Sequence, residues 1–533
     1  MSFISWQYAL YLPAVALLYW RMPLRARVWL LLIASYVFYG VWDERFLALL
    51  LTSTCIDFYC GLAMRGERHS IGRVFFTAAL PVLWLVGCTL ITGQTGAVAG
   101  WILGAAASFP VLFTTLYTVL WRQPEARQKR AFLWLSILTN LVVLGFFKYF
   151  NFFADNALAL AAALGWSPGW TLPNIILPVA ISFYTFQSIS YSVDIFRGKA
   201  EPVRDVVTFA AYLSFFPQLV AGPIERPNDL VPQFVKLPAF DWADVHRGLR
   251  LILIGLFKKV FVADNCALLA GHAFDPKTEL NAPWALIGAL AFAFQIYGDF
   301  SGYTDLARGS ARLLGFHLNM NFRFPYFARG PSDFWQRWHI TLSSWFRDYV
   351  YIPLGGNRHG TGRTLFNLWL TMLLAGLWHG ANWMYVLWGA YHGLLLIAYR
   401  LVKPLGDLER SEGSTPLKTM GAVALMFGFT LIGWVIFRCG SLDQAVAFAE
   451  MGAYFQSFTN WTTAGTVDWI GPFWWLLFHS LPLLLLQAAT WKARDEVENQ
   501  HWPWGVRGFV YGLLFLAVAT SAVSEQEFIY FQF

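Results

Sequence analysis

Apolar stretches long enough to cross a lipid bilayer recur along this chain from its first twenty residues to its last thirty. A bilayer core about 30 Å thick needs about 20 mostly apolar residues per helical span. In hydrocarbon every backbone N–H and C=O has to find its partner within the protein, so only helices or a closed barrel can cross. The stretches show no two-residue alternation, which favours helices. The sequence therefore predicts an all-α integral membrane protein.

The composition agrees with this class. Of the 533 residues, 57% are hydrophobic and only 13% are charged, with a mean hydropathy of +0.49, whereas an ordinary soluble domain is roughly 25% charged. The net charge of +7 comes from Lys and Arg clusters between apolar segments, which indicates membrane topology and not a nucleic-acid surface. Five scattered cysteines without CxxC spacing predict neither a zinc site nor a disulfide framework. We expect lipid as a partner, and no nucleic acid, metal or tightly bound cofactor.

Hydropathy windows of about 19 residues place most spans at the two ends of the chain. Those before residue 200 lie near 5–20, 28–42, 46–64, 74–92, 98–121, 131–153 and 174–195. Those after residue 360 lie near 365–379, 384–400, 418–437, 470–489 and 505–523. Between them, polar residues, Pro and Gly interrupt the apolar runs of about 205–400. Irregular backbone at membrane depth is tolerated only where protein buries it or it lines a cavity, so we expect re-entrant or interfacial helices and no neat spans there.

Basic and non-basic loops alternate along the first part of the chain. The loops at 21–27, 65–73 and 122–130 are rich in Lys and Arg, whereas those at 43–45 and 92–97 are not. Short cytoplasmic loops carry the excess of basic residues. We therefore expect the three basic loops in the cytoplasm of a bacterium, with the chain in its inner membrane and both termini outside. The first stretch has no basic leader or cleavage site, and we expect it to be retained.

Four of the ten histidines, His339, His379, His392 and His479, stand within or against apolar segments. Ionisable residues are costly there and are functional candidates by default, although a hydrogen-bonded core histidine remains an alternative for each. Sequence context favours two of them. His339 in FWQRWHITLSSWFRDY and His379 in LAGLWHGANW each follow a tryptophan directly.

A neutral imidazole can take a proton from a hydroxyl and return it to a leaving group, which suits acyl transfer. We expect the apolar surroundings of His379 to keep it neutral, as a general base requires, and Gly376 and Gly380 to permit close approach of a helix or a ligand. No phosphate-binding loop, HExxH, GxSxG or dinucleotide fingerprint is present, which disfavours nucleotide hydrolysis and metalloproteolysis.

A polar cluster interrupts the segment YGDFSGYTDLARGSARLLGF, with Asp299, Ser301, Tyr303, Asp305 and Arg308 close together. It could bind a polar ligand. Alternatively, Asp305 and Arg308 form a structural i,i+3 ion pair, which is the interpretation we favour.

Several strings from about 174 to 395 resemble, in order, the membrane-bound O-acyltransferase (MBOAT) proteins of the bacterial alginate O-acetylation type. They are LPVAISFYTFQSISYSVDIFRG, FFPQLVAGPIERP, IGLFKKVFVADN, YGDFSGYTDLARG, FWQRWHITLSSWFRDYVYIPLGGNR and MLLAGLWHGANWMYVLWGAYHG. The resemblance implies a catalytic His379 and a second important histidine, His339. It also implies a multi-span ring or funnel of helices around a thin core, crossed by an acyl group whose cytoplasmic donor is acetyl-CoA. An extra apolar stretch at about 74–121 departs from that type.

No repeat or long linker divides the chain, so we expect one polytopic membrane domain over 1–533. Within it, the resemblance suggests N-terminal spans at 1–172, an MBOAT-like catalytic core at 173–400, C-terminal spans at 401–523 and an extracytoplasmic tail at 524–533.

The tail, SEQEFIYFQF, resembles the FIY-containing terminus of the small membrane partner in teichoic-acid D-alanylation systems. One interpretation is an interfacial aromatic anchor. The other makes Tyr530 an acyl acceptor that enters the core from outside and carries the acyl group.

The leading hypothesis is an O-acetyltransferase for an exported polysaccharide, working with an exported SGNH-hydrolase-like acyltransferase or with the polymer itself on the outer side. Transfer of D-alanyl or another acyl group to a cell-envelope polymer is the alternative within the same family. A transporter or flippase would also explain many spans and intramembrane charges, but the inverted repeats typical of transporters are not evident.

Overall fold

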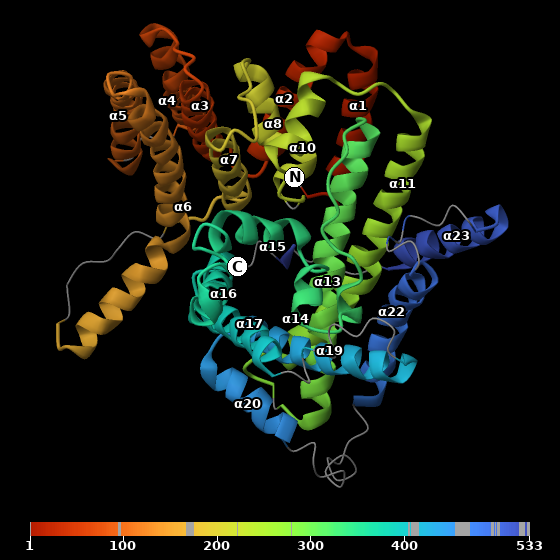
Figure 1. Cartoon of the computed structure of the whole chain (residues 1–533). Coiled ribbons are helices and arrows are strands. Elements are labelled where there is room, and N and C mark those ends of the chain that lie inside the picture. Colours follow the sequence, from red (N-terminus) through yellow and green to blue (C-terminus); the bar gives the residue numbers. More distant parts are fainter. Residues whose placement is uncertain are drawn as a thin grey trace. The chain divides into compact units, whose positions relative to one another are not determined.

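The computed structural model describes residues 2–93, 97–166, 175–220, 222–278, 280–402, 406, 415–453, 469–491, 495, 497, 502–521 and 528–529. Every regular element in these ranges is a helix (Figure 1). Within the same ranges, six helices are long and apolar enough to cross a membrane: Glu44–Met64, Ile71–Thr92, Glu125–Ala163, Ala282–Leu313, Pro416–Arg438 and Ile470–Ala489. The predicted all-α, multi-pass class is confirmed.

The chain forms two compact units, one of residues 1–245 with 310–318 and the other of residues 246–309 with 319–533. The first unit contains the N-terminal helices close to where hydropathy places them. They are α1 (Trp6–Arg21), α2 (Leu24–Gly40), α3 (Leu47–Met64), α4 (Ile71–Thr92), α5 (Ala97–Leu120), α6 (Glu125–Ala163) and α7 (Ile181–Phe196). Three short helices for which hydropathy predicts no span follow: α8 (Val206–Ser214), α9 (Phe216–Leu219) and α10 (Pro227–Val235).

Local chemistry sets several of these helix ends. Ser5 caps α1, since its hydroxyl accepts a hydrogen bond from the backbone N–H of Tyr8. Gly93 ends α4 in the left-handed conformation, at φ +66°, which glycine adopts without steric cost. On the outer faces apolar side chains stay exposed, as lipid contact requires; Leu90 and Ile91 of α4 are 79% and 87% exposed.

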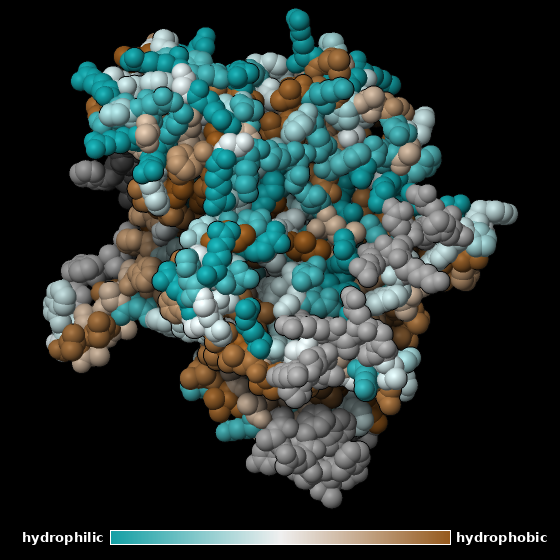
Figure 2. Space-filling model, in the orientation of Figure 1, coloured by the Kyte–Doolittle hydropathy of each residue, from teal (hydrophilic) through white to brown (hydrophobic). Residues whose placement is uncertain are grey.

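The second unit begins with a long helix pair. Helix α11 (Trp242–Leu256) continues through a π-helical segment, η2 (Phe257–Ala263), into α12 (Asp264–Ala273), and this run precedes α13 (Ala282–Leu313). Short pieces follow: η3 (Pro325–Phe327), α14 (Pro331–Trp335), α15 (Ile340–Phe346) and the π-helical η4 (Arg347–Tyr351). The longer helices are α16 (Gly360–His379), α17 (Trp383–Leu401), α19 (Pro416–Arg438), α20 (Leu442–Ala453), α22 (Ile470–Ala489) and α23 (Trp504–Thr520). Hydrophobic side chains reach the surface over α17, α20 and the far end of α6 (Figure 2).

Helix α13 corrects one sequence-based expectation. Between residue 205 and the span near 365–379 we expected no neat span, but α13 is a regular helix of 32 residues and one of the six that can cross a membrane. Its most apolar window has a mean hydropathy of only 1.2, because charged and polar residues interrupt it, and 83% of that window is buried inside the protein. The short helices between residues 325 and 351 do agree with the expected irregular backbone.

Candidate active site

Three glycines bring the backbone of α13 against the run from α11 to η2. A Cβ added at Gly302 would lie 2.8 Å from the carbonyl oxygen of Gly255, and one at Gly298 would lie 2.8 Å from that of Lys258. Gly309 meets the carbonyl oxygen of Gly248 in the same way. Small residues at such spacing let two membrane helices touch at the backbone. The two lysines of η2 therefore face the carboxylates of α13.

These facing groups form a buried ionic cluster. Lys258 Nζ lies 2.7 Å from Asp305 Oδ2, and Lys259 Nζ lies 2.7 Å from Asp264 Oδ1 and 2.9 Å from Asp299 Oδ1. All five side chains are buried. A buried charge is tolerated when an opposite charge and hydrogen bonds compensate it. The pairing explains how α13 keeps two carboxylates inside an apolar protein.

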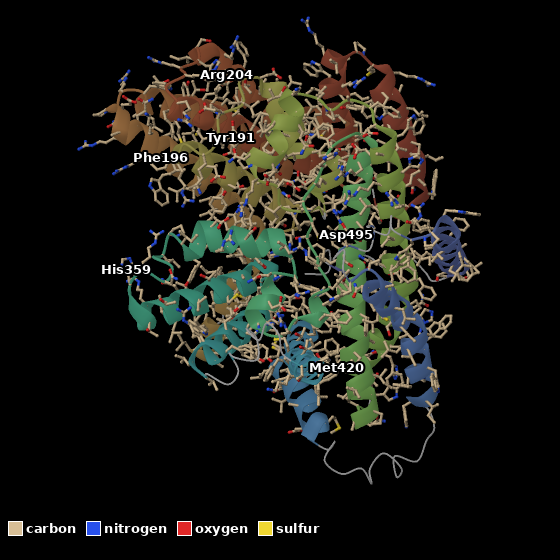
Figure 3. All side chains as sticks on the ribbon, turned by 45° about the vertical axis from the view of Figure 1, so that its right-hand side comes forward. Tyr191, Phe196, Arg204, His359, Met420 and Asp495 are labelled. Atoms are coloured by element: carbon tan, nitrogen blue, oxygen red, sulfur yellow. The ribbon has the colours of Figure 1, made fainter. Side chains whose placement is uncertain are left out.

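Arg308 extends the cluster. Its Nη1 lies 3.1 Å from Asp305 Oδ1, which confirms the predicted i,i+3 pair. Its Nη2 lies 3.6 Å from Oδ2 of Asp495, which follows α22 and is labelled in Figure 3. The cluster thus connects α13 to a segment almost two hundred residues further along the chain.

The described part of the C-terminal tail lies inside the second unit. Phe528 and Ile529 are each only 1% exposed. The backbone N–H of Ile529 donates a 2.6 Å hydrogen bond to Asp299 Oδ2. The Phe528 ring lies 4.2 Å from that of Tyr303 and 5.9 Å from that of Phe300, centroid to centroid. Tyr530, the predicted acyl acceptor, lies outside the described residues.

His339 is completely buried at the N-cap of α15 and adopts a left-handed backbone conformation, with φ +43°. That region is unfavourable for a residue with a Cβ, and such strain is concentrated at functional sites. Asn321 holds the residue in place. Its carbonyl oxygen accepts from the N–H of Ile340 (2.9 Å), and its Oδ1 lies 3.0 Å from His339 Nδ1.

The hydrogen bonds of Asn321 also determine the tautomer of His339. Asn321 Oδ1 accepts from the backbone N–H of Thr341, which can only donate. His339 Nδ1 therefore carries the proton, and Nε2 keeps a lone pair. Nε2 is buried and has no hydrogen-bond partner among the residues that the structure describes. Burial lowers the pKa of His339 to about 3, so the ring is neutral.

Aromatic rings form the walls around His339. Phe300 meets it edge-on at 4.6 Å between centroids, and Trp378 lies at 6.0 Å. Phe300 also contacts Phe528 of the tail. The tail and the histidine therefore share one ring of α13 as a common wall.

His379 is the last residue of α16 and is 4% exposed. Helices α16 and α17 touch at the backbone, since a Cβ added at Gly376 would overlap the carbonyl oxygen of Tyr385. This confirms the close approach expected from the glycines. The His379 ring lies 4.9 Å from that of Trp388 and 5.3 Å from that of Phe437. Trp378, which contacts His339, directly precedes it.

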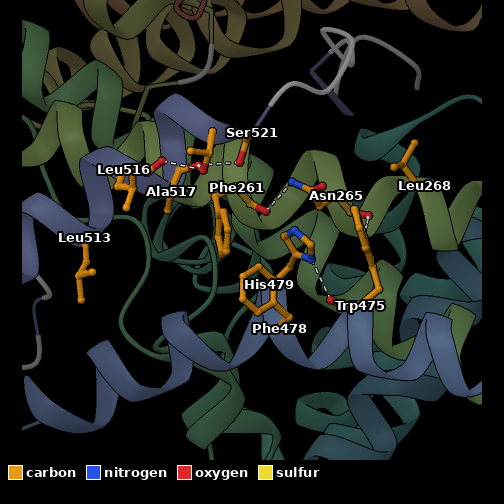
Figure 4. A pocket seen from close by; sticks show the side chains of 11 residues that line it. Phe261, Asn265, Leu268, Trp475, Phe478, His479, Leu513, Leu516, Ala517 and Ser521 are labelled. Carbon is orange, nitrogen blue, oxygen red and sulfur yellow. Dashed lines mark hydrogen bonds between the residues drawn. The ribbon is translucent and has the colours of Figure 1, made fainter.

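The other two candidate histidines have different surroundings. His392 is buried among aromatic rings and shares Trp388 with His379, at 4.8 Å. His479 lines a separate pocket of about 680 Å³ between η2, α12, α22 and α23 (Figure 4). Its Nδ1 lies 2.8 Å from the carbonyl oxygen of Trp475, which agrees with the hydrogen-bonded core interpretation.

Sequence reasoning missed two residues of this site. Asn321 stands in an unremarkable loop, and nothing in the local sequence signals its role. Lys259 had a signal: two adjacent lysines interrupt the apolar run IGLFKKVFVADN, with Asp264 five residues later. In an apolar segment such charges have to be paired.

Comparison with known proteins gives a consistent result. A model of the MBOAT, membrane-bound O-acyltransferase family matches residues 199–441. The chain is 38% identical over 553 residues to a probable alginate O-acetylase of Pseudomonas putida, which covers 98% of both proteins. It is 33% identical over 454 residues to a peptidoglycan O-acetyltransferase of Helicobacter pylori, covering 80% of this chain and 74% of that one. A teichoic acid D-alanyltransferase of Bacillus subtilis is more distant, at 27% over 283 residues, with 50% and 69% covered.

Proposed function

Because the chain belongs to the membrane-bound O-acyltransferase family, we propose that it transfers acetyl groups across the membrane for O-acetylation of an exported polysaccharide. The relatives named as a probable alginate O-acetylase and a peptidoglycan O-acetyltransferase are more similar and more fully covered than the D-alanyltransferase. Acetyl-CoA on the cytoplasmic side is the proposed donor. The observation that supports this chemistry is that His339 is neutral and fully buried, with a lone pair on Nε2 that can accept a hydrogen bond.

In the proposed reaction, His379 is the general base. It takes the proton of an acceptor hydroxyl while the hydroxyl oxygen forms an ester bond with the acyl carbon. The thioester C–S bond breaks, and the proton passes to the departing thiolate. His339 can only accept at Nε2, since Nδ1 donates to Asn321, and so it is suited to orient a hydroxyl in the site.

The tail supplies a candidate for the first acceptor. We assign this role to Tyr530, whose phenol would receive the acyl group and pass it on outside. Support comes from Phe528 and Ile529, which are buried in the same unit as both histidines. The final step would fall to an exported SGNH-hydrolase-like acyltransferase or to the polysaccharide itself.

The proposed location is the bacterial inner membrane. Both termini would face outward and the basic loops at 65–73 and 122–130 would face the cytoplasm, as the positive-inside rule requires. This orientation puts the tail on the side of the exported polymer.

Competition between acyl donors tests which acyl group the protein transfers. Purified protein in lipid nanodiscs is incubated with radiolabelled acetyl-CoA and an excess of unlabelled acyl donors. Competition by acetyl-CoA with no competition by an activated D-alanyl donor is expected. No labelling from acetyl-CoA, together with labelling from a radiolabelled activated D-alanyl donor, would replace acetyl transfer by D-alanyl transfer.

A further inference from the structure

The contact between Asp299 and the tail joins parts of the chain that are 230 residues apart. Asp299 uses its two oxygens for different partners: Oδ1 faces the ammonium of Lys259 at 2.9 Å, and Oδ2 accepts the N–H of Ile529 at 2.6 Å. Hydrogen bonds to an ionised acceptor are short and about twice as strong as neutral ones. The tail is therefore held through its backbone by a carboxylate that Lys259 fixes in place.

Two aromatic rings of α13 contact Phe528, the residue directly before Ile529. Tyr303 lies one helical turn after Asp299 on α13, and its ring contacts Phe528 at 4.2 Å. Phe300 completes the wall. One face of α13 thus offers an acceptor for a backbone N–H beside an aromatic surface for a phenylalanine, and a peptide with this order of groups fits both.

The unoccupied state of this surface would be unfavourable. Asp299 is 2% exposed, and without Ile529 its Oδ2 would lose the hydrogen bond that the tail donates. A buried carboxylate oxygen without a donor costs free energy. The surface therefore favours an occupant that presents an N–H group.

We propose that Asp299, Lys259, Phe300 and Tyr303 form a peptide-docking site for the chain's own C-terminal segment, and that Asp299 sets the register of that segment. By covalent connection, the residue after the clamped Ile529 is Tyr530. The consequence for activity rests on the proposed function: clamping Ile529 positions Tyr530 for acyl transfer, which makes Asp299 a positioning residue.

The first test removes the backbone N–H of Ile529 and leaves Asp299 unchanged. Ile529→Pro deletes the donor, whereas Ile529→Val keeps it and serves as the control. Full-length protein in nanodiscs is treated with carboxypeptidase, and intact-mass spectrometry follows the removal of Tyr530. This cleavage requires the protease to bind residue 529, which it can do only when the tail has left the docking site. Because proline before the cleaved bond slows carboxypeptidases, each rate is divided by that of a free peptide with the same C-terminal sequence. We expect this relative rate to be about tenfold higher in Ile529→Pro than in the parent, the factor that one strong hydrogen bond controls, and to be parental in Ile529→Val.

A second pair of variants probes the other partner. Asp299→Ala and Asp305→Ala each remove one buried carboxylate of α13 that faces a lysine of η2, but of the two only Asp299 has a hydrogen bond to the described tail residues 528–529. Faster trimming in Asp299→Ala alone is expected. Equal acceleration in both variants would show general loosening and overturn the assignment to Asp299, as would a parental relative rate in Ile529→Pro.

Polymer acetylation by the same variants separates the docking site from the proposed function. Faster removal of Tyr530 together with lost polymer acetylation supports both the docking site and the role of Tyr530 in acyl transfer. A tail that is released while acetylation continues unchanged supports the docking site and removes Tyr530 from the reaction.

Discussion

His339 combines three features that a purely structural histidine does not need: a left-handed backbone, a proton fixed on Nδ1 by Asn321 and a buried Nε2. The backbone conformation costs of order 1–3 kcal/mol. A surrounding structure that holds a residue in this way selects one orientation of its ring. At the residue scale, His339 is thus a preorganised acceptor whose ring lies near Trp378, the residue directly before His379.

Replacing His379 tests the proposed base. His379→Ala should lower polymer acetylation by a factor of order 10²–10⁴, because a positioned general base contributes about that much. Protein level and elution volume should match the parent, since only one ring at a helix end is removed. Acetylation at the parental level in cells would refute the role of His379.

The pH dependence of stability follows from His339. Its folded-state pKa of about 3 lies below the unfolded value of about 6.5. The unfolded chain therefore binds more protons as the pH falls, and the stabilising contribution, fully present above pH about 6.5, is lost progressively toward pH about 3. Thermal unfolding in nanodiscs from pH 7.5 to 5 should show a smaller decrease in Tm for His339→Gln than for the parent. Equal decreases would show that His339 is not neutral and buried.

Tyr530→Phe isolates the hydroxyl of the tail. The substitution keeps nearly all apolar surface and removes only the phenol oxygen, so acyl carriage predicts lost polymer acetylation at a normal protein level. An interfacial anchor predicts almost no change. Acetylation measured on the isolated polymer decides between them, with Phe531→Tyr as a control that leaves Tyr530 in place.

At the scale of elements, the close contact of α13 with the run from α11 to η2 depends on glycine. An added methyl group at Gly302 would lie 2.8 Å from the carbonyl oxygen of Gly255 and 3.0 Å from the backbone nitrogen of Lys259. Backbone atoms cannot move aside as a flexible side chain does. The two lysines keep their pairing only while the helices remain this close.

Gly302→Ala should therefore destabilise the protein by about 1–3 kcal/mol, the usual cost of overpacking. Gly428→Ala in α19 is the control, because a Cβ added there would meet nothing within 4 Å among the described residues and alanine favours a helix by up to about 1 kcal/mol over glycine. Thermal unfolding of both variants provides the comparison. A Gly302→Ala variant as stable as Gly428→Ala would contradict the backbone contact.

At the scale of the whole molecule, the orientation in the membrane decides which loops face the proposed cytoplasmic acyl donor and which face the exported polymer. Cysteines introduced singly at Ser70 and Gln94 should differ in their reaction with an impermeant maleimide added to intact cells: the cysteine at 94 should react and the cysteine at 70 should not. All five native cysteines are buried, so background labelling should be low. The opposite pattern would reverse the proposed topology.

The sequence by itself determined the class of the protein and most of its helices, and it singled out His339 and His379 as candidate site residues. These depend on local properties: about 20 apolar residues in a row require a span in lipid, and a histidine in such surroundings is conspicuous without any knowledge of its neighbours. The same reasoning predicted the Asp305–Arg308 pair, whose members are one helical turn apart.

Only the tertiary structure decided what those residues contact. Lys258 and Lys259 pair with the carboxylates of Asp305 and Asp299 in α13, and a hydropathy average carries no information on such pairs. Asn321 fixes the tautomer of His339 from 18 residues away, and Asp299 binds Ile529 across 230 residues. The physical reason is the same in each case: the energy of a buried polar group depends on the partner that the fold brings to it, and sequence spacing does not encode that partner.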